Sequence, residues 1–308
     1  MTKIRVPPGA FRCKIRNLSF TWETATSMSE TTLLVFMAAR SKRINELEPG
    51  NDEEKFRILS KLVSYTSDQA HSSVERASLL AMLKLRRIPT ASDRVVNGAL
   101  LEEAMQRDID QGLIPFLFVA TLGSTGSCVF DCLDTTGEIC KKYGVWMHVD
   151  AAYAGSAFIC PEYQGYLKGV QNFQIPLGRR FRSLKVWFVL RYYGVTKLQE
   201  YIRKHIKLAH DFAALLVEEN DDFELVDQVR MALVCFRLKK GNKYTEELLK
   251  RINKRGKIYL INSVYEKPEY IFYIRFAVCH QFATIEHIRY AIEVIKDCYR
   301  AMKEEEDF

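Results

Sequence analysis

One acidic residue, Asp150, stands at the end of an apolar stretch where a carboxylate could do chemistry. Residues 145–149 read Val-Trp-Met-His-Val, and Asp150 is followed by Ala-Ala-Tyr-Ala-Gly. The first run is typical of a buried strand, and the small residues after it leave open space beside the acid. Ligands of open α/β sheets bind at the carboxyl ends of the strands, so Asp150 could meet a cofactor. It could equally cap the next segment, and the pattern alone favours neither.

Two further candidates also follow predicted strands. His71 lies between the strand predicted at 62–66 and the helix that begins after it, where an imidazole ring can stack on a ligand or transfer protons. The loop 123–127, Gly-Ser-Thr-Gly-Ser, follows a near-continuous apolar run at 114–121. Each has a structural interpretation as well, since a lone histidine is usually structural and such a loop is more often a plain turn.

Hydroxyl groups precede the first predicted helix. Ser27 and Ser29 come just before the apolar helical stretch 33–40. The free N–H groups and the dipole of a helix N-terminus can bind a phosphate. An ordinary helix cap is the more frequent reason for serines at such a place.

The elements that must position these residues alternate strand, helix, strand, which predicts a doubly wound α/β domain. Its strands are predicted at 62–66, 114–121 and 145–150, and its helices at 99–110 and 133–143. The later half of the chain predicts a smaller α+β domain. Its strands are expected at 223–226, 233–238 and 272–278, and its helices at 183–193, 197–219, 245–255 and 284–302.

Composition is that of an ordinary globular protein. The chain of 308 residues is 48% hydrophobic and 27% charged, with a net charge of +7. Its basic residues are scattered, so nucleic-acid binding has little support beyond net charge. The eight cysteines form no Cys-x-x-Cys pair and several lie in apolar runs, which favours buried free thiols in a reducing compartment. We expect a cytoplasmic protein, with no metal site, secretory signal or membrane span.

Four stretches resemble the pyridoxal-phosphate (PLP) dependent group II amino-acid decarboxylases, most closely the aromatic-L-amino-acid decarboxylases. They are Ser-Asp-Gln-Ala-His-Ser-Ser-Val-Glu-Arg at 67–76, Thr-Leu-Gly-Ser-Thr at 121–125, the run 148–161, and Gln-Ile-Pro-Leu-Gly-Arg-Arg-Phe-Arg at 174–182. The resemblance implies a fold type I large domain, incomplete here, at 23–186. A small α+β domain would occupy 187–308, and residues 1–22 diverge.

The resemblance also implies roles for individual residues. Asp150 would accept the hydrogen bond of the pyridine nitrogen, which favours the electron-withdrawing pyridinium. His71 would stack on the ring and assist catalysis, and Ala152 would pack against it. Thr125 would lie beside the cofactor. Ser27 and Ser29 match the start of the helix that binds the cofactor's phosphate in the family.

Substrate choice and assembly follow from the same resemblance. Gly178 stands where histidine decarboxylases have serine, which favours an aromatic amino acid over histidine, although a histidine decarboxylase-like lineage stays an alternative. His71, where aldehyde-forming insect relatives have asparagine, favours decarboxylation to an aromatic amine. The family forms homodimers, but its first interlocking helices are not recognisable in residues 1–22.

The family's Schiff-base lysine lies in an Asn-Pro-His-Lys-Trp-like motif, and this chain has no such motif. Val170 is followed within four residues by the Gln-Ile-Pro-Leu motif, so the lysine segment and the mobile catalytic loop are missing. Lys168 matches a non-catalytic position, and Lys185 matches an ordinary helix. We therefore expect little or no decarboxylase activity from this chain. It could instead be a non-catalytic homologue that acts through a partner subunit.

Overall fold

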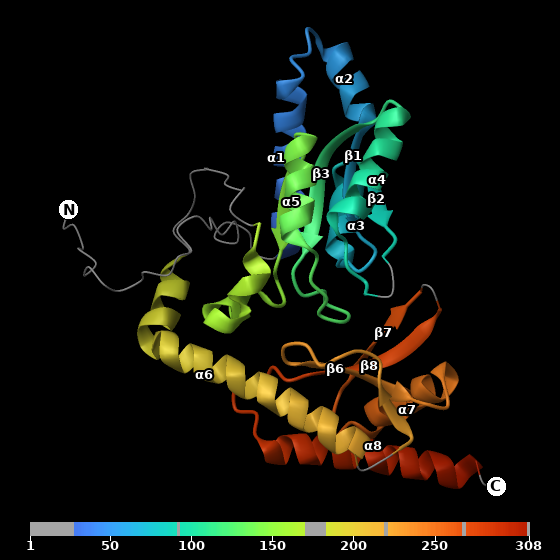
Figure 1. Ribbon diagram of the computed structural model, residues 1–308. Coiled ribbons are helices and arrows are strands. Elements are labelled where there is room, and N and C mark those ends of the chain that lie inside the picture. The colour runs from blue at the N-terminus through green and yellow to red at the C-terminus, as the bar shows by residue number, and fades with distance from the viewer. Residues whose placement is uncertain (1–27, 91–92, 170–182, 219–220, 267–268, 307–308) are drawn as a thin grey trace.

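The computed structural model describes residues 28–90, 93–169, 183–218, 221–266 and 269–306, which form two lobes (Figure 1). The first lobe is built around a four-stranded parallel sheet with the order β2-β1-β3-β4. Its elements are α1 (Met28–Glu46), α2 (Asp52–Lys61), β1 (Leu62–Ser67), α3 (Ser72–Leu80), β2 (Lys84–Ile88), α4 (Gly98–Asp110), β3 (Ile114–Thr121), α5 (Leu133–Lys142), β4 (Trp146–Asp150) and the 3₁₀ helices η2 (Gly155–Ile159) and η3 (Pro161–Leu167). The predicted parallel α/β domain is confirmed.

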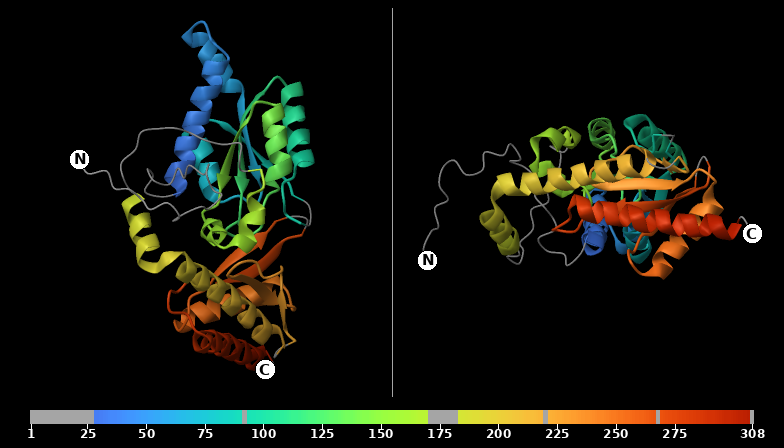
Figure 2. Two further views of the ribbon diagram at one scale, coloured as in Figure 1. Left: turned by 60° about the vertical axis from the view of Figure 1, so that its left-hand side comes forward. Right: turned by 90° about the horizontal axis from the view of Figure 1, so that it is seen from below.

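Helices cover both faces of this sheet because its strands are apolar on both sides. On β3, Phe118 packs with α4 and α5, whereas Leu117 and Val119 pack with α1 and α3. β1 is buried along its whole length. In the register between β3 and β4, Thr121 lies opposite Asp150. The carboxyl ends of the parallel strands therefore meet at one edge, which faces the second lobe in Figures 1 and 2.

The second lobe is an antiparallel sheet with the order β5-β6-β8-β7, packed on three helices. Its elements are α6 (Ser183–Glu218), β5 (Phe223–Leu225), β6 (Leu233–Leu238), α7 (Asn242–Arg255), β7 (Ile261–Tyr265), β8 (Ile271–Ala277) and α8 (Ile285–Glu306). Phe212 of α6 stacks on Phe276 of β8, with ring centroids 3.8 Å apart. The smaller α+β unit expected from the sequence is present.

The predicted break between two helices is present, because α6 consists of two helical stretches joined at a kink at Gly194. Gly194 has φ 73° and ψ 165°, a backbone conformation that is not helical. The predicted domain boundary between residues 186 and 187 falls inside α6, and the N-terminal segment 1–22 lies outside the described residues. The division into domains stays a prediction.

Helix α2 and strand β7, like the 3₁₀ helices η2 and η3, had no expectation from the sequence. Helix α2 buries no residue fully, and Asn51 caps it with a side chain that accepts the N–H of Glu54 at 2.8 Å. Strand β7 lies at the edge of its sheet and is half exposed, pairing only with β8. None of the helices in the described ranges is long and apolar enough to cross a membrane.

Candidate cofactor pocket

A pocket opens at the carboxyl edge of the parallel sheet, where the sequence placed its candidate residues. Five of the six predicted site residues line it: Ser29, His71, Thr125, Asp150 and Ala152. The sixth, Ser27, lies outside the described residues. Four lining residues were not predicted: Ser73, Thr121, Gly123 and Tyr153. Segments more than 100 residues apart in the chain therefore meet at one place.

Asp150 is the last residue of β4 and is buried, with 7% of its surface exposed. Its Oδ1 accepts the backbone N–H of Ala152 at 3.0 Å, and its backbone oxygen accepts the N–H of Leu122 at 2.8 Å. Within the part of the chain that the structure describes, Oδ2 accepts no hydrogen bond. One carboxylate oxygen is thus used to turn the chain, and the other remains for a donor in the pocket.

His148 lies two residues before Asp150 on the same strand, and burial lowers its pKa below the ordinary value, opposed by the charge of Asp150. Its Nε2 is buried without a partner among the described residues. A neutral imidazole is the form that such burial favours. His148 therefore leaves the negative charge of Asp150 uncompensated, and a cationic group in the pocket would find a carboxylate ready to stabilise it.

His71 caps the N-terminus of α3, which fixes its ring at the pocket. Its Nδ1 accepts the backbone N–H of Ser73 at 3.2 Å, and the Ser73 hydroxyl lies 2.9 Å from the same nitrogen. A nitrogen that accepts a backbone N–H carries no proton, so the neutral ring is protonated at Nε2. Ser73 is buried and was missed in the sequence, although a hydroxyl residue two positions after a helix cap is a usable signal for this contact.

The loop 123–129 brings Thr125 to the pocket and is closely packed. Gly123 has φ +82°, and a Cβ there would lie 2.5 Å from the Cβ of Ala154. Inside the loop, the Ser124 hydroxyl accepts the N–H of Val129 at 3.2 Å and lies 3.2 Å from the hydroxyl of Ser127. Only glycine fits at position 123, because the loop after β3 touches the turn after β4 there.

Behind the pocket, a second buried carboxylate holds the end of β3. Asp131 accepts the N–H of Val96 at 2.9 Å with Oδ1 and the N–H of Thr121 at 2.8 Å with Oδ2. Burial raises its pKa to about 6, although both N–H groups favour the ionised form. Asp131 stands in no motif that would single it out, and its role is to fix Thr121 at the pocket wall.

Together these groups can hold a flat, heteroaromatic cofactor. The carboxylate of Asp150, the imidazole that Ser73 orients and the small side chain of Ala152 line the same pocket. Ser29, in the first turn of α1, adds a hydroxyl at the N-terminal end of that helix. Among the residues found to line the pocket there is no lysine. The described residues also include no cluster suited to bind a metal ion.

Known proteins resemble this chain over most of its length. The pyridoxal-dependent decarboxylase conserved domain matches residues 23–172 and 169–239. The aromatic-L-amino-acid decarboxylase of Manduca sexta is 43% identical over 87% of this chain and 63% of its own length. That of Rattus norvegicus is 42% identical over 88% of this chain and 67% of its own length. A crystal structure of Oryza sativa TDC with PLP and tryptamine superposes with a TM-score of 0.81 and 34% identity, covering 90% of this chain and 67% of that one.

This chain spans somewhat less than two thirds of the length of the Manduca relative. The match to that relative has 323 positions, whereas 87% of 308 residues is about 268, so about 55 positions inside the matched part of the relative have no counterpart here. The conserved domain likewise matches in two pieces that overlap at residues 169–172.

Proposed function

Because this chain belongs to the pyridoxal-dependent decarboxylase family, with a parallel α/β lobe consistent with part of fold type I, we propose that its pocket binds pyridoxal 5'-phosphate in the manner of an aromatic-L-amino-acid decarboxylase. One observation carries the proposal. Five residues predicted from sequence to hold this cofactor line a single pocket at the carboxyl edge of the sheet. The identity of 43% to a curated aromatic-L-amino-acid decarboxylase supports the same substrate class, aromatic L-amino acids.

Each residue has a task that follows from its surroundings. Asp150 would receive the pyridine N–H at Oδ2, and its charge would keep that nitrogen protonated. When bound, PLP supplies an electron sink for the carbanion left by departing CO₂. His71, held by Ser73, would stack on the ring and present the Nε2 proton. Ser29, together with Ser27, would hold the phosphate at the start of α1.

The pocket residues fit the cofactor only in part. The groups for non-covalent binding are present, whereas the lysine that would bind PLP covalently is not among the lining residues. The family match breaks near Val170, where the sequence lacks the lysine motif. Without that lysine, PLP has no covalent bond to the protein. The faster route, in which the substrate amine replaces a protein lysine on the cofactor, is then lost. We infer that this chain binds PLP reversibly and has little or no decarboxylase activity by itself.

Two alternatives remain part of the proposal. The chain could act as a non-catalytic homologue that works through a partner subunit, or its lineage could be that of a histidine decarboxylase. The glycine that argues against the second, Gly178, lies outside the described residues. A homodimer and a cytoplasmic location are further proposals. Seven cysteines are free in the described part of the chain, and five of them are buried, as expected in a reducing compartment.

The test is a PLP titration of the purified chain followed by borohydride reduction. We expect a saturable change in cofactor absorbance, no covalent adduct after reduction, and no release of CO₂ from L-tryptophan or L-DOPA above the background of free PLP. A trapped lysine adduct would contradict our interpretation of the missing segment. In that case, Lys168→Arg and Lys185→Arg would show which lysine reacts. Failure to bind PLP at all would refute the proposed function.

The origin of the shortened sequence has a separate test. Sequencing the mature transcript across Val170 and Gln171 would show whether the junction is present in the message. Finding it there in abundance, uninterrupted, supports a shortened protein with a non-catalytic role. Finding an inserted lysine segment, of up to about 55 codons by the number of unpaired positions inside the match to the Manduca relative, would show that the mature message encodes the segment this sequence lacks.

A further inference from the structure

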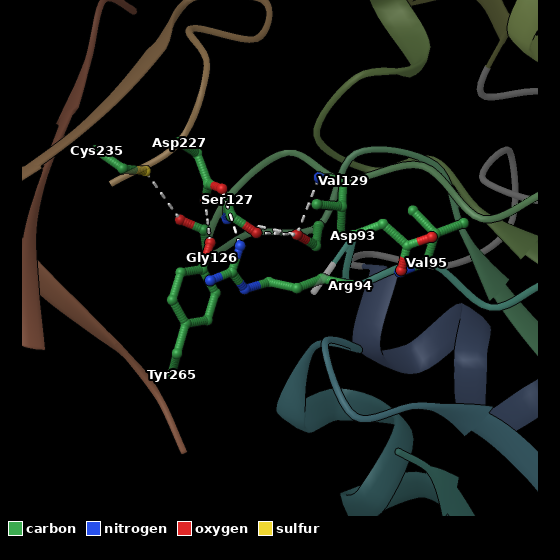
Figure 3. A network of polar contacts seen from close by, with 10 residues as sticks. Asp93, Arg94, Val95, Gly126, Ser127, Val129, Asp227, Cys235 and Tyr265 are labelled. Atoms are coloured by element: carbon green, nitrogen blue, oxygen red, sulfur yellow. Dashed lines mark hydrogen bonds and ion pairs between the residues drawn. The ribbon is translucent and has the colours of Figure 1, made fainter. Parts of the chain in front are cut away.

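A second polar cluster lies where the two lobes meet (Figure 3). Arg94 follows β2 in the parallel lobe, whereas Asp227 and Tyr265 belong to the antiparallel lobe. The Arg94 Nη1 lies 2.9 Å from the Asp227 Oδ1, and the guanidinium carbon lies 3.5 Å from the centre of the Tyr265 ring. The Tyr265 hydroxyl donates to the other carboxylate oxygen of Asp227. We call these three side chains the interlobe cluster.

The three side chains of the interlobe cluster contact one another and are shielded from solvent. The side chains of Arg94 and Asp227 are 15% and 12% exposed. Both carboxylate oxygens of Asp227 are used, and burial raises the pKa of Tyr265 above its ordinary value, so its hydroxyl stays protonated and donates. Loss of one charged partner from such a site leaves the other charge buried and unpaired. The cluster therefore resists separation of the lobes at this point.

The antiparallel lobe also touches the loop 123–129 directly. The Cys235 thiol of β6 donates to the backbone oxygen of Gly126 at 3.5 Å. A Cβ on Gly126 would lie 3.3 Å from the Tyr273 hydroxyl, and the Tyr273 ring lies 4.8 Å from that of Tyr265. The tip of the loop thus contacts β6 and β8, which belong to the same sheet as β7, the strand that ends at Tyr265.

The other end of this loop is part of the pocket. Gly123 and Thr125 line the pocket. Within the loop, the Ser124 hydroxyl accepts the Val129 N–H and lies 3.2 Å from the Ser127 hydroxyl. A loop braced by internal hydrogen bonds moves as a unit. A shift at Gly126 therefore reaches Thr125.

We propose that Arg94, Asp227 and Tyr265 are positioning residues for the cofactor pocket: they fix the antiparallel lobe against the parallel one and so hold the loop 123–129 at the pocket wall. The expected effect on PLP affinity rests on the proposed function. The restraint on the loop itself rests on geometry alone. None of the three residues lines the pocket.

The experiment compares Asp227→Asn and Arg94→Met with the conservative Arg94→Lys, all in the full chain. Asparagine keeps the size of the carboxylate without its charge, and methionine keeps length without the guanidinium. Glu162→Gln is the matched control. It removes an ion pair with Arg203 that also joins distant segments, at 2.7 Å, but with side chains about half exposed and outside the interlobe cluster. Amide hydrogen exchange of residues 123–129 and of β1 is measured by mass spectrometry, and PLP affinity by absorbance titration.

We expect Asp227→Asn and Arg94→Met to speed exchange in the loop 123–129 by about tenfold or more while β1 is unchanged. PLP affinity should fall by about five- to tenfold, as for sites coupled at a distance. Arg94→Lys should recover part of both, and Glu162→Gln should change neither. Unchanged exchange in the loop, or equal acceleration in β1, would overturn the inference. If the wild-type chain binds no PLP, the proposed function fails, and loop exchange alone still decides whether the interlobe cluster restrains the loop.

Discussion

Two buried aspartates near the same edge of the sheet, Asp150 and Asp131, differ in how much of their hydrogen-bonding capacity the fold uses. Asp131 gives one oxygen to the N–H of Val96 and the other to that of Thr121. Asp150 gives Oδ1 to the N–H of Ala152 and keeps Oδ2 at the pocket wall. The two are similarly buried, at 5% and 7% exposure, so burial does not separate them.

The difference shows how a structural acid and a candidate functional acid can be told apart. A carboxylate that satisfies two backbone donors serves the fold, because buried N–H groups need acceptors. A carboxylate with an oxygen left toward a pocket costs free energy that the fold alone does not recover. A ligand would therefore stabilise Asp150 rather than Asp131. Variants at Gly123, Asp131 and Asp150 test this difference between the two acids.

The largest effect is expected from Gly123→Ala, which would push the loop after β3 away from the turn after β4. The new Cβ would lie 2.5 Å from the Ala154 Cβ at a residue with φ +82°. Steric overlap and backbone strain together should lower the free energy of unfolding by about 4 kcal/mol. PLP binding should be lost with the pocket wall. Urea unfolding followed by circular dichroism measures the first effect.

A matched control isolates the contact from the backbone strain. Gly112 also has a positive φ, +74°, but nothing lies within 4 Å of the Cβ position. Gly112→Ala should therefore cost only about 1 kcal/mol. Equal costs for the two variants would show that the loops after β3 and β4 are not held together at Gly123.

The next effect concerns how Asp131 changes stability with pH. Burial raises its pKa to about 6 in the folded chain, above the ordinary 3.8, so the folded state binds the proton more tightly than the unfolded state. Its contribution is fully present below pH 3.8 and is lost as pH rises to about 6. The unfolding free energy of the wild type minus that of Asp131→Asn should therefore fall by about 3 kcal/mol across this window.

Urea titrations of both proteins from pH 4 to pH 7 give this difference directly. Asp134→Asn, at an exposed position in the first turn of α5, serves as the control for removing one carboxylate. A difference that stays flat with pH would mean that the two backbone donors outweigh burial, and that Asp131 is ionised throughout.

Much of this arrangement could be predicted from the sequence, and its limits have physical causes. The strand 114–121 was predicted to the residue because a fully buried strand is a continuous apolar run. The approach of Asp150 to His71 followed from parallel strands ending at one edge and from the family resemblance. Helix α2 was missed because it buries no side chain. Arg94 and Asp227 carry no local pattern, since they are 133 residues apart and meet only through the packing of two lobes.

The smallest effect on stability, and the most informative for function, is expected from Asp150→Asn. The Asn Oδ1 can still accept the Ala152 N–H, so the turn after β4 keeps its hydrogen bond, and the unfolding free energy should change by less than about 1 kcal/mol. The pyridine N–H would meet a neutral group in place of a charge, so PLP affinity should fall by about tenfold or more. Absorbance titration and urea unfolding on the same preparation separate the two quantities. A large loss of stability with unchanged PLP affinity would instead show that Asp150 serves only to hold the turn after β4. Asp150 and Asp131 would then both be structural acids.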